Sequence, residues 1–343
     1  MHGGYSLFKK AAVFTDIHFG LKGNSRIHND DCEEFIDWFI EQAKENNCET
    51  AIFCGDWHHN RNSLNLTTMD ATIRSMEKLG QAFEKCLMFV GNHDLYYKDK
   101  RDVSSTEFAR HIPGITVVDK ITVEDDVALV PWLIGDEWKK MEKIKAKYLF
   151  GHFELPSFYM NAMVQMPDHG DLRAEHFKNQ EYVFSGHFHK RQKQGKIHYI
   201  GNAFPHNYAD AWDDERGMMI LDRENNAEPE YINWWNCPKY RTVKLSELLD
   251  RTEEIIKPKM YLRVTLDLPV SYEEANFLKE TFIKQYGCRE ITLIPQKQIE
   301  EISTNLDIAQ FESVDQIVAS EIAELDTENF NKKMLLDIYN GLE

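Results

Sequence analysis

One pattern recurs five times in roughly the first 200 residues and restricts the folds open to this chain. Each time, a short apolar run rich in Val, Ile and Phe stops at a glycine or another small residue, and His, Asp or Asn follows. Short apolar runs of this kind are typical of strands covered on both faces. The polar groups that end the runs are Asp16-Ile17-His18, Asp56-Trp57-His58-His59, Asn92-His93-Asp94, His152 and His187-Phe188-His189.

Two amphipathic segments separate the first three runs. Residues 31–45 place Phe35 and Phe39 on one apolar stripe, and residues 66–85 place Met69 and Ile73 at helical spacing. Alternation of strands and helices predicts parallel pairing and an α/β layered fold. Because ligands collect beyond the carboxyl ends of parallel strands, we expect the five polar groups to meet at one site.

The pattern becomes hairpin-like from Ile115 onward. Strand-like runs are separated by turn-forming residues at 125–126, 194–195 and 224–226. A second sheet packed on the first would explain this change. The predicted fold is therefore an α/β two-sheet sandwich flanked by helices.

A polar stretch with scattered prolines begins after Pro238 and indicates a domain boundary. The terminal segment has an apolar stripe that suits either packing on its own domain or docking onto a partner. The expected units are a main domain at 1–238, a linker at 239–259, a small strand-helix-strand domain at 260–297, an acidic linker at 298–314 and a helical partner-docking segment at 315–343.

The strand-end side chains are metal ligands by type. A single His or Asp in such a place is usually a structural residue, but seven of them at five strand ends are not explained in this way. Imidazole, carboxylate and amide without thiolate suit Mn²⁺, Fe²⁺, Zn²⁺ or Mg²⁺ better than a structural zinc site. Seven donors suit two ions that share one carboxylate, an arrangement that polarises phosphoryl groups and activates water. The donors are Asp16, His18, Asp56, Asn92, His152, His187 and His189.

The order of these motifs over roughly residues 10–205 resembles that of the calcineurin-like metallophosphoesterase superfamily. The resemblance implies a two-sheet fold with two divalent cations, with Mn²⁺ the expected metal and Mg²⁺ the alternative. It assigns Asp16, His18 and His189 to one ion, Asn92, His152 and His187 to the other, and Asp56 to both. It also implies that His93 is the catalytic histidine and that Asp94 orients it.

A narrower resemblance rests on the sequence GDWHHNR, in which His59 lies three residues after Asp56. It is similar to the SbcD-type DNA repair nucleases, and the short chain resembles their phage members. That resemblance implies that His59 positions the phosphate in exonuclease action and that residues 260–297 form a capping domain. It further implies a DNA exonuclease with endonuclease activity that works in DNA end processing and recombination, as the nuclease subunit of a complex with an ABC-type coiled-coil ATPase. Asn202 departs from this pattern, because the family often has Ser at that position.

Two further sets of residues lie next to the motifs. Basic residues there are candidates for contacts with DNA phosphates, although charged runs are usually solvated surface. They are Arg61, Lys98, Lys100, Arg101, Lys190 and Arg191.

Apolar residues in the same region suit either a homodimer face or the core of the chain itself. They are Leu64, Tyr96, Tyr97, Val103 and Phe108.

Charge and composition limit the functions further. The 40 Lys and Arg against 57 Asp and Glu give a formal net charge of −17, which argues against holding nucleic acid by bulk charge alone. We therefore expect weak DNA binding that depends on metals, local basic loops and a partner. The six cysteines contain no C-x-x-C pair, and the chain lacks a long apolar run, so we expect a soluble cytoplasmic protein. Two alternatives remain, namely a phosphoesterase acting on phosphoproteins or cyclic nucleotides and a non-catalytic assembly subunit.

Overall fold

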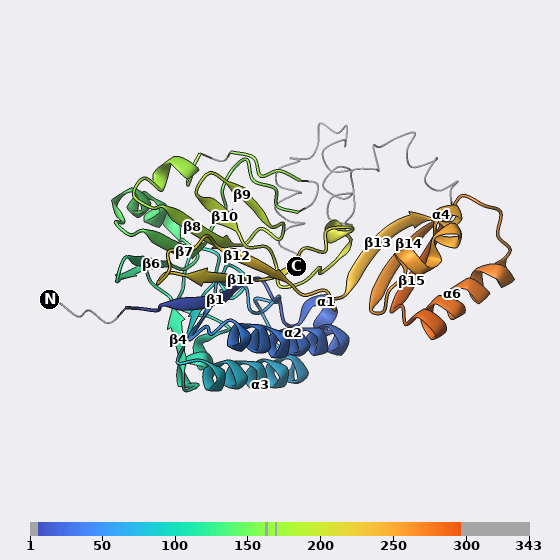
Figure 1. Cartoon of the computed structure of the whole chain (residues 1–343), viewed down its shortest axis with the longest axis horizontal. Coiled ribbons are helices and arrows are strands. Elements are labelled where there is room, and N and C mark those ends of the chain that lie inside the picture. Colours follow the sequence, from blue (N-terminus) through green and yellow to red (C-terminus); the bar gives the residue numbers. More distant parts are fainter. Residues whose placement is uncertain (1–5, 162–163, 169, 296–343) are drawn as a thin grey trace, which may run out of the picture. The chain divides into compact units, whose positions relative to one another are not determined.

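The computed structural model describes residues 6–161, 164–168 and 170–295, and within them the apolar runs form two six-stranded sheets (Figure 1). In the first sheet, the neighbours from β1 to β4 pair in parallel, whereas β11 pairs antiparallel with β1 and β12 pairs antiparallel with β11. The parallel pairing from β1 to β4 is the arrangement that alternating strands and helices require. The strand order is β12 (Glu230–Asn233), β11 (Gly217–Asp222), β1 (Lys10–Phe14), β2 (Thr50–Phe53), β3 (Lys85–Phe89) and β4 (Ile115–Val118).

Two long helices, α2 (Arg26–Glu45) and α3 (Leu66–Ala82), lie side by side against one face of the first sheet (Figure 1). Their apolar stripes enter a core cluster that also contains Phe14 of β1 and Phe53 of β2. Helix α3 is shorter than the predicted segment 66–85, because Lys85 already belongs to β3. The remaining helical segments of this part are α1 (Leu21–Asn24), η1 (Glu107–His111), η2 (Gly135–Lys143) and η3 (Ala174–His176).

The second sheet is also mixed. Two of its pairs, β5 with β6 and β9 with β10, are antiparallel hairpins at the predicted turns 125–126 and 194–195, and its other pairs are parallel. The order is β5 (Thr122–Glu124), β6 (Val127–Val130), β7 (Tyr148–His152), β8 (Tyr182–Gly186), β10 (Ile197–Tyr199) and β9 (Gln192–Gln194).

A second core lies between the two sheets. Val13 and Phe89 of the first sheet share one buried cluster with Phe150 and Phe184 of the second. Neighbouring residues such as Phe14 point to the helix-covered face instead, because side chains alternate along a strand. The predicted two-sheet α/β sandwich with flanking helices is confirmed.

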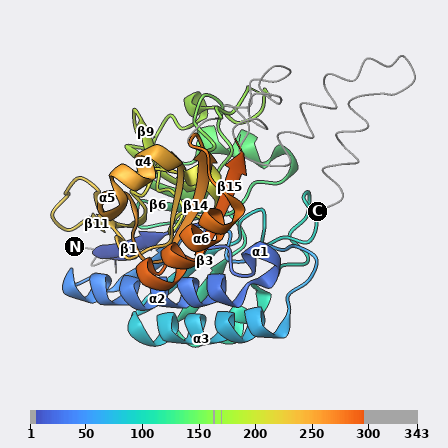
Figure 2. The same cartoon turned by 90° about the vertical axis from the view of Figure 1, so that its right-hand side faces the viewer.

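Residues 206–211 and the described residues 239–295 form a separate compact unit. Its parallel sheet consists of β13 (Lys239–Lys244), β14 (Met260–Leu266) and β15 (Glu290–Pro295). Helix α6 (Tyr272–Tyr286) joins β14 to β15 (Figure 2). It contributes the buried ring of Phe282 to the core of this unit. The strand, helix and strand predicted for residues 260–297 are therefore present.

The predicted linker at 239–259 is wrong, because these residues form β13 and two short helices, α4 (Leu245–Asp250) and α5 (Thr252–Ile255). Within β13 the side chains of Tyr240, Arg241 and Val243 are buried, whereas Thr242 and Lys244 are exposed. The main domain also differs from the expected 1–238, since a short segment with the 3-10 helix η4 (Tyr208–Asp210) belongs to the second unit. The acidic linker and the docking segment at 298–343 lie outside the described residues.

Two other features bear on the sequence-based expectations. All six cysteines are buried and unbridged. No helix in the described part of the chain is both long and apolar enough to cross a lipid bilayer.

Candidate metal centre

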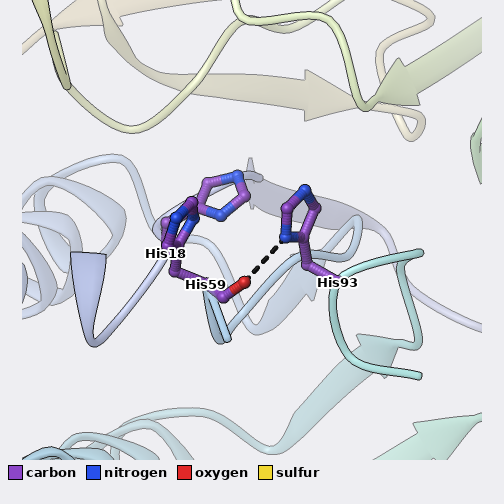
Figure 3. Close-up of side chains that lie close together, drawn as sticks. All are labelled: His18, His59 and His93. Carbon is purple, nitrogen blue, oxygen red and sulfur yellow. Dashed lines mark hydrogen bonds between the residues drawn. The ribbon is translucent and has the colours of Figure 1, made fainter. Parts of the chain in front are cut away.

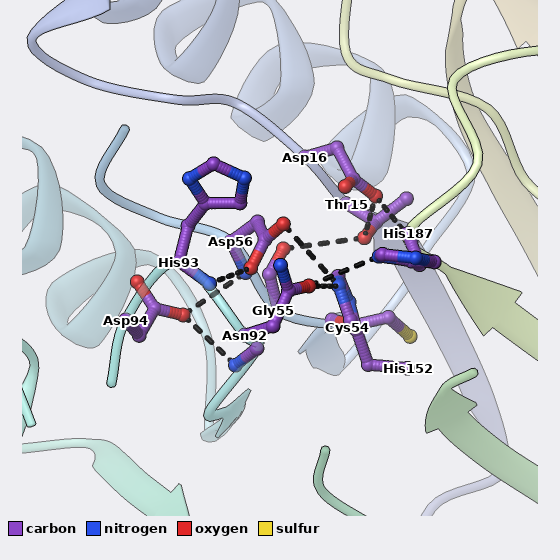
Figure 4. Close-up of polar contacts among 12 residues, drawn as sticks. Thr15, Asp16, Cys54, Gly55, Asp56, Asn92, His93, Asp94, His152 and His187 are labelled. Carbon is purple, nitrogen blue, oxygen red and sulfur yellow. Dashed lines mark hydrogen bonds and ion pairs between the residues drawn. The ribbon is translucent and has the colours of Figure 1, made fainter. Parts of the chain in front are cut away.

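The five predicted polar groups lie together just past the carboxyl ends of β1, β2, β3, β7 and β8 (Figure 4). Backbone hydrogen bonds continue beyond β1 and β2, so that the two loops leave the sheet together. The Asp16 N–H donates to the carbonyl of Gly55 at 3.0 Å, and the His18 N–H donates to the carbonyl of Asp56 at 3.2 Å. The parallel sheet thus brings residues distant in sequence to one place.

Two sets of donor atoms overlap at Asp56. In each set, one ligand atom per residue lies within 4.8 Å of the others. One set consists of Asp16, His18 and Asp56, and the other of Asp56, His152 and His187. A carboxylate that belongs to two neighbouring sets is the arrangement that a pair of bridged cations requires.

The remaining two predicted donors lie at the same place. The Oδ1 atom of Asn92 is 3.0 Å from His152 Nε2 and 3.0 Å from His187 Nδ1, so it joins the second set. The ring of His189 lies 5.3 Å from the ring of His18, centroid to centroid, on the side of the first set. All seven predicted donors are therefore brought together.

Asp16 provides a test of whether these residues fit cations. Its Oδ2 atom accepts hydrogen bonds from the Thr15 hydroxyl at 2.6 Å and from the His187 N–H at 3.0 Å. Its Oδ1 atom is buried and has no hydrogen-bond partner among the described residues, although His18 Nε2 lies 3.7 Å away. A buried carboxylate oxygen without a hydrogen bond is unfavourable unless a cation lies beside it. Oxygen and imidazole donors of this kind fit divalent cations such as Mn²⁺ and Mg²⁺.

Four of the donors have a left-handed backbone conformation. The φ angles of Asp16, His18, Asp56 and His187 are 51°, 53°, 63° and 87°. Such conformations cost of order 1–3 kcal/mol each and cluster at functional sites. The neighbouring Gly91 is needed for a different reason, since a Cβ at that position would overlap the Asp56 carboxylate.

The charges of the second set are strongly coupled. Burial alone would raise the pKa of Asp56, but the neighbouring His152 and His93 hold it well below its usual range. Burial alone would lower the pKa of His152, but Asp56 raises it to about 9. Its Nδ1–H donates to the carbonyl of Cys54 at 2.8 Å, which directs Nε2 towards Asn92 and Asp56 (Figure 4). A cation that binds Nε2 must displace a proton from it.

Three histidines line one side of the centre (Figure 3). His93 Nδ1 donates to the backbone carbonyl of His59 at 2.7 Å, and the two rings are stacked with centroids 5.4 Å apart. The ring of His18 lies 4.9 Å from that of His93. Burial, together with the neighbouring His18, lowers the pKa of His59 to about 2. His93 and His59 therefore lie directly beside the first donor set.

Asp94 does not orient His93 as the resemblance implied. Its carboxylate accepts hydrogen bonds from four backbone N–H groups, those of Asp56, Trp57, His58 and Gly91, at 2.9 to 3.1 Å. The carbonyl of His59 orients the His93 ring instead. Asp94 therefore holds the loop that bears Asp56, whereas its neighbour His93 lies beside the first donor set.

The side chain of His58 packs inside the chain. Its ring nitrogens lie 2.8 Å from the Ser105 hydroxyl and 3.1 Å from the Thr72 hydroxyl. The ring is fully buried.

Two of the candidate DNA contacts have other partners within the chain. Arg101 binds the Glu137 carboxylate and the carbonyl of Trp132. Arg191 donates to the carbonyl of Ile200 at 3.1 Å and lies 4.7 Å from the ring centroid of Tyr231. These expectations are corrected, because the sequence places both residues beside the site but tertiary contacts turn them inward. Lys98 and Lys100 are exposed, and Arg61 and Lys190 are half-buried.

The candidate dimer face divides in a similar way. Tyr96, Tyr97 and Val103 are exposed. Phe108 packs against the core instead, and Leu64 is half-buried.

Glu154 and Trp132 belong to the site but were missed from the sequence. Glu154 Oε2 lies 3.2 Å from His187 Nε2, and the ring of Trp132 lies 5.1 Å from that of His187. A carboxylate that holds the far nitrogen of a metal-binding histidine fixes the ring. The position of Glu154, two residues after His152, is the signal that could have identified it.

Comparisons with known proteins agree with this geometry. The profile of the calcineurin-like phosphoesterase family matches residues 9–191. Exonuclease subunit 1 of Enterobacteria phage T4 is 30% identical over 231 residues, which cover 64% of this chain and 67% of that protein.

Similar solved structures have low TM-scores. A nuclease named MPE from Pseudomonas putida is 21% identical with a TM-score of 0.28, and the match covers 55% of this chain and 66% of that one. The phosphoesterase Yfce from E. coli is 14% identical with a TM-score of 0.33, and the match covers 65% of this chain and 100% of that one. A dimetal phosphatase from Danio rerio is 10% identical with a TM-score of 0.39, and the match covers 67% of this chain and 100% of that one.

Proposed function

Because this chain belongs to the calcineurin-like phosphoesterase family, we propose that it is a metal-dependent DNA phosphodiesterase, an exonuclease with endonuclease activity. The observation that supports the proposal most is the pair of donor sets that share Asp56, with His93 beside them. The choice of DNA as substrate is supported by the similarity to a phage exonuclease subunit.

Two divalent cations, Mn²⁺ or alternatively Mg²⁺, are proposed to occupy the centre. When bound, they supply an activated water and neutralise charge that develops on the phosphoryl oxygens. The proposed ligands are Asp16, His18 and His189 for one ion, Asn92, His152 and His187 for the other, and Asp56 for both.

His93 is proposed to protonate the leaving oxygen of the cleaved phosphodiester. Its Nδ1 is engaged by the carbonyl of His59, so the proton passes through Nε2. The stacked ring of His59 is proposed to position the phosphate beside it. Asp94 acts indirectly, by holding the loop on which Asp56 lies.

The nuclease is proposed to work in DNA end processing and recombination, in the cytoplasm, as a subunit of a complex with an ABC-type coiled-coil ATPase. Residues 315–343 are the proposed docking segment, and residues 260–297 the proposed capping domain. Tyr96, Tyr97 and Val103 are proposed to contribute to a homodimer face, which their exposure supports. The proposed contacts with DNA phosphates are Arg61, Lys98, Lys100 and Lys190.

A nuclease assay tests the substrate. With Mn²⁺ present, the chain should release nucleotides from linear duplex DNA, and the Asp56→Asn variant should not, since it alters the shared ligand. A chromogenic phosphate monoester, a phosphopeptide and a cyclic nucleotide serve as competing substrates. Hydrolysis of one of these without any cleavage of DNA would contradict the proposal.

A pull-down tests the partner. The chain without residues 315–343 should fail to co-purify with the ATPase but should retain its metal-dependent activity. Co-purification of the truncated chain would show that the docking segment is wrongly assigned. Elemental analysis of the full chain provides the control for an intact centre.

A further inference from the structure

A cavity of about 320 Å³ lies beside the second donor set. His152 lines this cavity and belongs also to the second set, so the cavity borders the metal centre. Its volume is at the lower end of the range of about 300–1,000 Å³ that is usual for small-molecule sites. The nuclease assignment above does not use it.

The walls of the cavity are mainly aromatic and aliphatic. Trp132, Trp138 and Phe153 line it together with Leu133 and Met166. The rings of Trp132 and His187 lie 5.1 Å apart, so this wall begins at the metal centre itself (His187 in Figure 4). Flat aromatic walls of this kind hold flat ring systems by stacking.

The polar groups of the cavity suit a neutral ring with N–H donors. Glu154 and Asp171 supply carboxylate oxygens, and the described lining includes no lysine or arginine. A phosphate would be repelled by these carboxylates, whereas the amino and imino groups of a nucleobase can donate to them. The cavity therefore distinguishes the base of a nucleotide from its phosphate.

We propose that this cavity takes the unstacked base of a nucleotide that flanks the cleaved phosphate. The inference rests on the proposed nuclease function, and it adds a substrate subsite. A phosphodiester at the metal centre has a nucleoside on either side, and Trp132 of the cavity wall lies beside the rings of His152 and His187. Unstacking is easiest in single strands and at frayed ends, so such DNA is the preferred substrate.

The test uses short single-stranded oligonucleotides with one phosphodiester, the other linkages being methylphosphonates. In one substrate the nucleoside 5′ of the phosphodiester is abasic, and in another the 3′ nucleoside is abasic. With Mn²⁺, one of the two abasic substrates should lose about 5- to 150-fold in kcat/KM, which is the range that stacking of one base on an aromatic side chain contributes. Fluorescence anisotropy without added metal should show a loss of affinity for the same substrate.

A variant links the effect to the cavity. Trp138→Ala should weaken cleavage of the intact oligonucleotide and abolish the difference between intact and abasic substrates. Trp235→Ala is the matched control, because Trp235 is 60% exposed and does not line the cavity. The measurements on the unaltered chain do not depend on the folding of either variant.

The outcomes separate the two proposals. If the unaltered chain cleaves intact and both abasic oligonucleotides equally well, the base subsite is overturned and the nuclease assignment stands. If it hydrolyses a simple phosphate ester but no oligonucleotide, the nuclease assignment fails and the subsite fails with it.

Discussion

The carboxylate of Asp94 accepts a hydrogen bond from the backbone N–H of Asp56 at 2.9 Å and so fixes the residue that belongs to both donor sets. Asp56 has a φ of 63°, in the left-handed region that residues other than glycine adopt uncommonly. The same carboxylate holds the next two backbone N–H groups and that of Gly91. Asp94 thus organises the loop from inside, without lying among the donors.

Replacing Asp94 should therefore destabilise the fold. Asp94→Ala leaves four buried N–H groups without their acceptor, and we expect the free energy of unfolding to fall by about 3 kcal/mol or more. Asp94→Asn keeps one acceptor oxygen and should lose less. Urea unfolding measures both, with exposed Asp102→Ala as the control. A loss below about 1 kcal/mol in Asp94→Ala would contradict this role.

Replacing Glu154 should weaken metal binding at the second set. Glu154 accepts a hydrogen bond from His187 Nε2, which keeps Nδ1 directed at Asn92. Removing such a partner typically lowers metal affinity about 10- to 100-fold. We expect a loss of this size in Glu154→Ala and a smaller one in Glu154→Gln, which keeps an acceptor. Calorimetric titration with Mn²⁺ measures the affinity, and Glu175→Gln is the control because Glu175 is exposed. Equal affinity in Glu175→Gln and Glu154→Ala would refute this role of Glu154.

Replacing His93 should separate turnover from metal binding. His93→Ala removes the proposed proton donor but none of the seven proposed ligands, so metal content should stay unchanged. The turnover number should fall by about 10²- to 10⁴-fold, the usual contribution of a positioned acid or base. Nuclease assays with Mn²⁺ and elemental analysis of the same sample test both statements. Normal turnover in this variant would remove His93 from the mechanism.

His198 should make the stability of the fold sensitive to acid. Burial lowers the pKa of this histidine from 6.5 to about 4 in the folded chain. Between these pH values the unfolded chain binds the extra proton, so stability falls as pH falls from 6.5 to 4. The contribution of this one group reaches about 3 kcal/mol at the lower end of that range.

A comparison of variants isolates this effect. His198→Gln should reduce the slope of unfolding free energy against pH in the same interval, measured by urea unfolding at several pH values. His111→Gln is the matched control, because that imidazole is exposed. An unchanged slope in His198→Gln would show that the buried ring does not resist protonation.

The sequence determined the position of the centre because its donors follow strands. Parallel pairing places the carboxyl ends of neighbouring strands at one edge, so Asp16, Asp56 and Asn92 had to meet once the strands were identified. The second sheet was predicted from its turn-forming residues, because hairpin turns are local features of a sequence. Local pattern therefore sufficed for the sandwich and for all seven donors.

Only the tertiary structure decided which way neighbouring polar side chains point. Arg101 and Arg191 turn inward to partners distant in sequence, and Asp94 turns to the loop of Asp56 and away from His93. Strand β13 looked like a linker because its place in a sheet depends on pairing with β14. The walls of the cavity likewise meet the centre only through long-range packing. These features depend on contacts between distant segments, and a local pattern does not determine which distant partner a polar side chain reaches.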